Sequence, residues 1–145
     1  MDADAMSQAN VQQAVPFFAV ADIEASVRWY VGGLGFDQTA EWVVDGRLRW
    51  CWLKLGDAAL MLQEYETEGP PASPPPGKAG EGVTVYFICR DALAIYREIT
   101  GRGVEASRPF VGNRMWVTYL RDPDGYRLAF ESPTEVAEGT EHTAD

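Results

Sequence analysis

The chain has 145 residues, of which 46% are hydrophobic, and its formal net charge at pH 7 is −10. This length and composition predict one folded domain and exclude a chain that is mainly disordered. The acidic balance argues against nucleic-acid binding, which needs a basic surface. No apolar run approaches the roughly 20 residues that cross a membrane, and the start of the sequence lacks the features of a signal peptide. We therefore expect no membrane partner and a cytoplasmic location.

The negative charge is concentrated in three segments. Residues 1–10, 64–81 and 131–145 carry formal charges of −2, −3 and −5, which sum to −10. The remaining body of the chain is therefore neutral. This distribution is typical of solvated flanking segments and is only weak evidence for a cationic ligand.

The first half of the chain shows the pattern of a strand, a helix and three further strands. An apolar run at 14–20 predicts the first strand, and Asp22 is a plausible N-cap of the helix that follows. Apolar residues recur there at helical spacing, and Gly32, Gly33 and Gly35 are expected to end this helix. Alternating segments at 39–44, 47–55 and 58–64 then predict three strands, and the turn Asp45–Gly46 predicts a hairpin.

The second half repeats this order after a proline-rich segment. Asp91 caps a predicted helix at 92–103, which lies between a strand at 82–89 and three short strand-like segments that end at 126–131. Asp22 and Asp91 lie 69 residues apart, as do Gly56 and Gly125, which indicates an internal duplication. Within one domain overall, we expect a flexible N-terminus (1–11), a first unit (12–64), a linker (65–80), a second unit (81–133) and an acidic disordered tail (134–145).

Duplicated βαβββ units that end in the sequence DPDG resemble the vicinal oxygen chelate superfamily, which includes glyoxalases, bleomycin resistance proteins and extradiol dioxygenases. The residues that carry the resemblance are VADIEASVRWYVGGLGF at 20–36 and LRDPDGYRLAFESP at 120–133. The resemblance covers about residues 12–133. It implies an α+β fold in which two tandem βαβββ units form curved mixed sheets around a concave pocket.

The resemblance also implies where a metal site would lie. In the family, metal ligands come from the first and last strands of each unit, and these positions correspond to Val15, Met61, Thr84 and Ala129. Valine and alanine have no side-chain lone pair to donate to a metal ion. The single histidine, His142, lies in the acidic tail. We therefore expect the inherited metal site to be absent, and we predict no cofactor and no catalytic residue.

The alternation of side chains along the predicted strands indicates which residues face the pocket. Cys51, Leu53 and Leu55 suit a core face, which leaves Trp50 and Trp52 on the other face. Aromatic walls with a few polar groups are typical of small-molecule sites. The predicted ligand-binding residues are Phe17, Trp50, Trp52, Met61, Gln63, Thr84, Tyr86, Trp116, Arg127, Ala129 and Glu131. The aromatic residues could instead fill the core or a dimer interface, and Arg127 and Glu131 could be a solvated pair near the pocket mouth.

Three hypotheses for the function follow from these residues. The first is a metal-free homodimer that sequesters an aromatic or antibiotic-like small molecule, in the manner of bleomycin resistance proteins. The second is a lyase, isomerase or dioxygenase that uses a divalent metal (Zn, Ni, Mn or Fe), with Gln63, Glu64 and Glu131 as the nearby donors. The third is a non-catalytic regulatory module.

No serine lies near a histidine in a nucleophile motif. Cys51 and Cys89 are expected to be reduced thiols.

Overall fold

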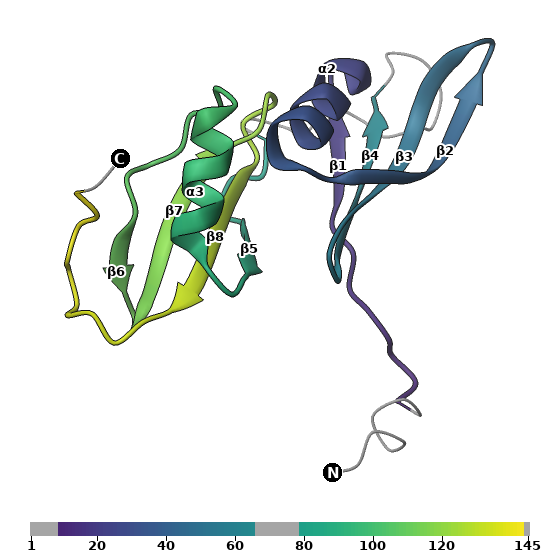
Figure 1. Ribbon diagram of the computed structural model, residues 1–145. Coiled ribbons are helices and arrows are strands. Elements are labelled where there is room, and N and C mark those ends of the chain that lie inside the picture. The colour runs from purple at the N-terminus through teal and green to yellow at the C-terminus, as the bar shows by residue number, and fades with distance from the viewer. Residues whose placement is uncertain (1–8, 66–78, 144–145) are drawn as a thin grey trace.

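The computed structural model of the protein describes residues 9–65 and 79–143. Residues 1–8 of the predicted N-terminal segment and most of the predicted linker lie outside the described residues. Figure 1 shows two units, each a sheet with a helix packed on one of its faces. The elements of the first unit are β1 (Phe17–Val20), α2 (Ile23–Val27), the π-helical segment η1 (Arg28–Leu34), β2 (Asp37–Val44), β3 (Arg47–Leu55) and β4 (Ala58–Glu64). Those of the second unit are β5 (Thr84–Ile88), α3 (Ala92–Gly101), β6 (Phe110–Gly112), β7 (Met115–Arg121) and β8 (Arg127–Pro133).

The two sheets have equivalent topologies, with strand orders β1-β4-β3-β2 and β5-β8-β7-β6. In each sheet the first strand pairs in parallel with the last strand, and the other pairs are antiparallel. The predicted α+β fold of two βαβββ units with mixed sheets is therefore confirmed. The predicted hairpin at Asp45–Gly46 is also confirmed, because both residues have a positive φ (52° and 74°), as a two-residue turn of this kind requires.

Each helix is held at its N-terminus by its own cap and by the last strand of its unit. Asp22 and Asp91 accept hydrogen bonds from the backbone N–H groups three residues on, as predicted for N-caps. The carboxylate of Glu64 also accepts the Ile23 N–H at 3.0 Å, while the Ser132 hydroxyl accepts the Ala92 N–H at 2.8 Å. Strand and helix are thereby joined at the same point in both units.

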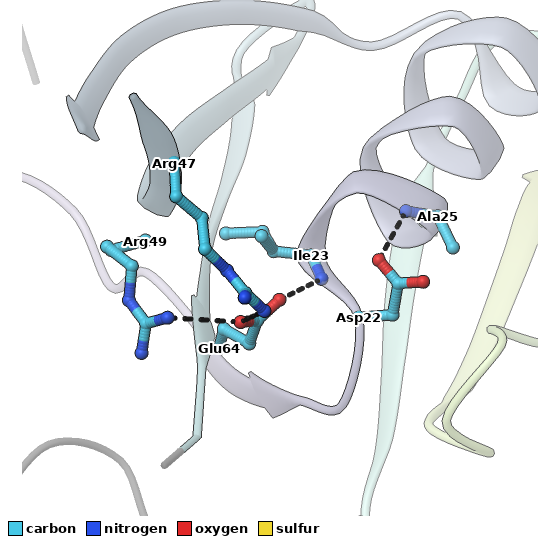
Figure 2. Close-up of polar contacts among 6 residues, drawn as sticks. All are labelled: Asp22, Ile23, Ala25, Arg47, Arg49 and Glu64. Carbon is cyan, nitrogen blue, oxygen red and sulfur yellow. Dashed lines mark hydrogen bonds and ion pairs between the residues drawn. The ribbon is translucent and has the colours of Figure 1, made fainter. Parts of the chain in front are cut away.

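Glu64 is buried on the helix side of the first sheet, and Figure 2 shows its polar contacts with Ile23, Arg47 and Arg49 of the same unit. It forms ion pairs with Arg47 and with Arg49, the latter at 3.2 Å, in addition to its bond with Ile23. A buried carboxylate needs such partners because loss of its hydration is costly. Glu64, one of the donors named in the metal-dependent hypothesis, is thus engaged by these partners on the helix side of its sheet.

The first helix continues further than predicted. Gly32 and Gly33 lie inside η1 and do not end it, and only Gly35, with φ of 90°, forms the left-handed cap. Position 33 needs a glycine for a steric reason. A Cβ there would come within 2.8 Å of the Val104 side chain in the second unit. The glycine allows close approach of the two units at this point.

The core is continuous between the two units. Phe36 of the first unit contacts Phe87 of the second with ring centroids 5.8 Å apart, and Phe87 in turn packs on Phe130. Phe18 and Tyr126 stack across the same boundary at 4.2 Å. The hydrophobic cluster of the chain therefore includes residues of both units, which accounts for a single domain built from a duplicated sequence.

The turn between β7 and β8 binds the second unit to the first. The buried carboxylate of Asp122 accepts hydrogen bonds from the Tyr30 hydroxyl at 2.8 Å and from the N–H groups of Asp124 and Tyr126. Asp124 accepts the Ala21 N–H, and the Tyr126 hydroxyl donates to the Ala19 carbonyl oxygen. Burial, with an increase from Asp124, raises the pKa of Asp122 to about 6, although its hydrogen bonds lower it.

The segment after β8 is ordered as far as the described residues extend, which differs from the predicted disordered tail. Thr134 and Gly139 donate backbone hydrogen bonds to Arg114 and Val111, and Val111 donates to Thr140. Glu141 forms an isolated bridge with Phe110, so this segment covers the outer edge of β6. The acidic composition led to the prediction of a disordered tail. The backbone N–H and C=O groups at an exposed sheet edge can, however, form hydrogen bonds with another segment whatever side chains that segment carries.

Cys51 and Cys89 are both free thiols, the first buried and the second half-buried. Burial raises the pKa of the Cys51 thiol to about 11 and also raises that of Cys89. No helix in the described parts of the chain is long and apolar enough to cross a bilayer.

We expect the free energy of unfolding of the wild type to rise relative to that of Asp122→Asn as the pH falls from 7 to 5. The pKa of Asp122 is about 6 in the folded protein and 3.8 ordinarily, so between these values the folded state holds a proton that the unfolded chain lacks. Between pH 7 and pH 5 the relative gain is on the order of 1 kcal/mol. Urea unfolding of both proteins at the two pH values measures it.

Tyr30→Phe is the matched control for this prediction. Its hydroxyl lowers the pKa of Asp122, so its removal is expected to move the stability change to higher pH. If the wild type and Asp122→Asn instead show the same pH dependence, the carboxyl does not titrate in this range.

Candidate ligand-binding face

Each sheet has one face covered by its helix and one face without a helix, which we call its open face. In β8, Leu128 and Phe130 belong to the core on the helix side, so Arg127, Ala129 and Glu131 lie on the open face. Strand register extends this assignment, because Thr84 pairs with Arg127 and Tyr86 pairs with Ala129. The structure thus brings these five predicted residues together on one face of the second sheet.

A pocket of about 410 Å³ lies on this face between aromatic side chains. Tyr86 and Tyr119 form one wall, with their hydroxyl oxygens 2.8 Å apart and their rings nearly perpendicular at 82°. Phe110 stands beside Tyr119 at a centroid distance of 6.1 Å, and Glu131 adds a carboxylate to the lining. The arrangement offers aromatic surface, two hydroxyls and one carboxylate to a ligand.

The two tyrosine hydroxyls form a hydrogen bond with each other. The hydrogen bond between Tyr119 and Tyr86, with smaller effects of burial and of nearby charge, raises the pKa of Tyr119 to about 12. Tyr119 is therefore protonated at neutral pH. In this pair one hydroxyl can donate to the other and the second can donate to a ligand, which gives the pocket a fixed polar group beside its aromatic wall.

A second hollow of about 360 Å³ lies further along the same face. Thr84, Tyr119, Arg121 and Arg127 line it, so Tyr119 borders both spaces. Arg127 and Glu131, which share this face, line different hollows. The alternative interpretation, in which Arg127 and Glu131 form a pair at the mouth of one pocket, therefore does not agree with the structure.

The open face of the first sheet carries the other predicted residues. Phe17 pairs with Met61, Trp52 also pairs with Met61, and Trp50 pairs with Gln63, so all five share one face. Phe17 is 47% exposed, and Trp42, which pairs with Trp50, is 53% exposed. This face is thus an exposed aromatic surface on the free monomer.

The predicted place of Trp116 is wrong. It pairs with Ser132 and Val111 on the helix side of the second sheet, and its ring meets that of His142, which also contacts Tyr96. The ordered C-terminal segment supplies this histidine, so Trp116 packs under a cover that the sequence pattern did not reveal.

Sequence reasoning missed Tyr119, Phe110 and Val117 in the pocket and Trp42 on the first sheet. The signal for Tyr119 was present, because it alternates with Leu120 of the core. It was obscured by Thr118, a polar residue that is buried on the helix side with its hydroxyl donating to the Ser107 carbonyl oxygen at 2.6 Å.

Comparison with known proteins agrees with this architecture. The family model of the Glyoxalase/Bleomycin resistance protein/Dioxygenase superfamily matches residues 11–130. The chain belongs to this superfamily. No curated protein shows significant sequence similarity to it.

Several solved structures resemble the chain in fold. TioX from Micromonospora sp. ML1 is 20% identical and aligns over 85% of this chain and 99% of that chain, with a TM-score of 0.66. TnmS3, an antibiotic binding protein from Streptomyces sp. CB03234, is 22% identical over 87% and 100%, with a TM-score of 0.61. A glyoxalase/bleomycin resistance protein/dioxygenase from Nocardioides is 20% identical over 97% and 96%, with a TM-score of 0.62. At these identities the likeness shows the shared fold alone.

Members of this superfamily that use a metal ion need donor side chains that this chain lacks at the corresponding positions. Val15 and Ala129 have none, Met61 offers a thioether and Thr84 a neutral hydroxyl. Among residues 9–65 and 79–143, no three His, Cys, Asp or Glu side chains gather as a metal-ligand group. The residues at these positions therefore do not fit a divalent metal ion.

Proposed function

We propose that this protein binds an aromatic or antibiotic-like small molecule on its open faces without a metal ion and without chemical conversion. The observation that carries the proposal is the pocket formed by Tyr86, Tyr119, Phe110 and Glu131. Its aromatic rings suit a flat apolar ligand, and its hydroxyl and carboxylate groups suit the ligand's polar substituents. The similarity in fold to TnmS3, an antibiotic binding protein, supports this choice of ligand class.

The residues around the pocket favour binding over catalysis. The single histidine packs between Tyr96 and Trp116 on the helix side of the sheet, so it does not reach the pocket as a general base. The high pKa of Tyr119 makes it a poor proton acceptor at neutral pH. Glu131 remains as a single carboxylate, which can orient a ligand by accepting its hydrogen bonds.

We further propose that a second copy of the chain covers the open faces. Strands β1 and β5 are sheet edges, since each pairs with only one strand, and they expose Phe17, Tyr86 and Ile88 to solvent by 47%, 45% and 64%. Unpaired edges with exposed apolar side chains favour association. The open faces of both sheets would then line a shared site, which the aromatic surface of the first sheet suits.

The first test is ligand binding by variants of the two faces. Tyr119→Leu is expected to weaken binding of a polycyclic aromatic antibiotic about tenfold, because it removes an aromatic contact and a hydroxyl. Trp116→Phe, on the opposite side of the same strand, is expected to leave the dissociation constant unchanged. Fluorescence or calorimetric titration of a panel of such antibiotics, bleomycin included, measures both. Equal loss in the two variants, or no binding across the panel, would contradict the proposal.

The second test is the oligomeric state. Light scattering coupled to size-exclusion chromatography should give a mass twice the 16.0 kDa of one chain. Ile88→Lys places a charge on the exposed edge of β5 and is expected to shift the protein toward the monomer. Arg97→Lys on α3, which keeps the charge, is the matched control. A monomeric wild type at tens of micromolar would argue against the second copy.

The third test concerns the metal. Calorimetric titration with Zn²⁺, Ni²⁺ and Mn²⁺ should detect no micromolar binding, either in the wild type or in Ala129→Glu, because one added carboxylate leaves Val15 without a donor. Ala129 is fully buried, so the new charge should also destabilise the fold, by on the order of 2 kcal/mol. Micromolar binding to the wild type that Glu131→Gln abolishes would instead favour the metal-dependent enzyme.

A further inference from the structure

A groove of about 630 Å³ runs along the junction of the two units, between the α2–η1 helix and the chain that follows α3. From the first unit it is lined by Arg28, Trp29 and Gly32, and from the second by Arg102 and Arg121. None of its lining residues belongs to the pocket at Tyr86 and Tyr119. The groove is therefore distinct from that pocket, although Arg121 also lines the second hollow of the open face, and neither unit could form the groove alone.

Three arginines line this groove against a single carboxylate. Arg28 lies in η1, Arg102 directly follows α3 and Arg121 ends β7, and Glu105 is the acidic residue among the lining side chains. In residues 9–65 and 79–143, none of the three guanidinium groups forms an ion pair. Like charges gathered in one groove raise its potential and attract anions, and this occurs in a chain whose formal net charge is −10.

The local backbone keeps the groove open and holds one arginine in place. Arg102 donates from Nη1 to the Gly33 carbonyl oxygen at 3.1 Å, across the boundary between the units. A Cβ at Gly33 would clash with Val104, whereas a Cβ at Gly32 would meet nothing within 4 Å. Both glycines lie in a π-helical segment, a rare conformation that often occurs at functional sites.

The side chains define the ligand chemistry. A guanidinium group binds carboxylate and phosphate oxygens with two parallel hydrogen bonds. Trp29 is half-buried beside them and offers the side of an indole ring to an apolar group. We propose that the groove binds a small organic oxyanion, a phosphate or a carboxylate attached to a flat ring, as a site separate from the pocket of the open face.

The proposal is tested by calorimetric titration of the full chain with phenyl phosphate and with benzoate at low ionic strength. Binding of at least one probe is expected, and the two probes distinguish a phosphate from a carboxylate site. Arg28→Gln removes one charge from an exposed side chain and should weaken binding about tenfold. Gly32→Phe should block the groove and weaken binding at least as much, without changing any charge. Arg97→Gln, an exposed arginine on α3 outside the groove, should leave binding unchanged.

Each other outcome overturns the proposal. Absence of binding of both probes would show that the groove does not hold such anions, and equal weakening by Arg28→Gln and Arg97→Gln would show attraction to charge in general. If an acidic peptide binds and neither probe does, the groove is assigned to a protein partner. The antibiotic titration separates the two sites, since Arg28→Gln should leave it unchanged while Tyr119→Leu should weaken it.

Discussion

The arrangement of the two units depends on one buried carboxylate. Asp122 begins the turn between β7 and β8, is 5% exposed and accepts hydrogen bonds from Tyr30 of the first unit and from two N–H groups of its own turn. Loss of a hydrogen-bond partner of a buried carboxylate strongly destabilises the folded state. The turn therefore has little freedom to move relative to the first helix. The bonds of Asp124 and Tyr126 to the first unit then orient the second sheet.

Because of this arrangement of the units, the helix side of each sheet forms the core and the open face of each sheet does not. The helix sides share one core through Phe36 and Phe87, so both open faces are left without a structural neighbour in the monomer. Side chains such as Tyr86 and Phe17 can therefore be aromatic without contributing to the core. The same placement brings the end of α3 against η1, where Gly33 meets Val104, and so creates the arginine-lined groove.

The sequence predicted the fold because its signals are local and are repeated. The two aspartate caps and the alternation of Trp50 and Trp52 with Cys51 follow from helix and strand geometry alone. It misplaced Trp116 and the C-terminal segment because each depends on a contact distant in sequence, with His142 and with the edge of β6. The groove could not be predicted at all, since its arginines lie in three separate segments of the chain and meet only after the units pack.

The duplicated units also show how the chain uses its carboxylates. Glu64 and Ser132 occupy equivalent positions at the ends of β4 and β8, and both accept the first N–H of the neighbouring helix. Glu64 can do so as a buried charge because Arg47 and Arg49 pair with it. It is thereby withdrawn from any site on the open face, where Glu131 lines a pocket with the hydroxyl groups of Tyr86 and Tyr119. General acid and base roles commonly need two titratable groups with different pKa values. A lone carboxylate beside hydroxyl groups therefore supports the proposed binding function.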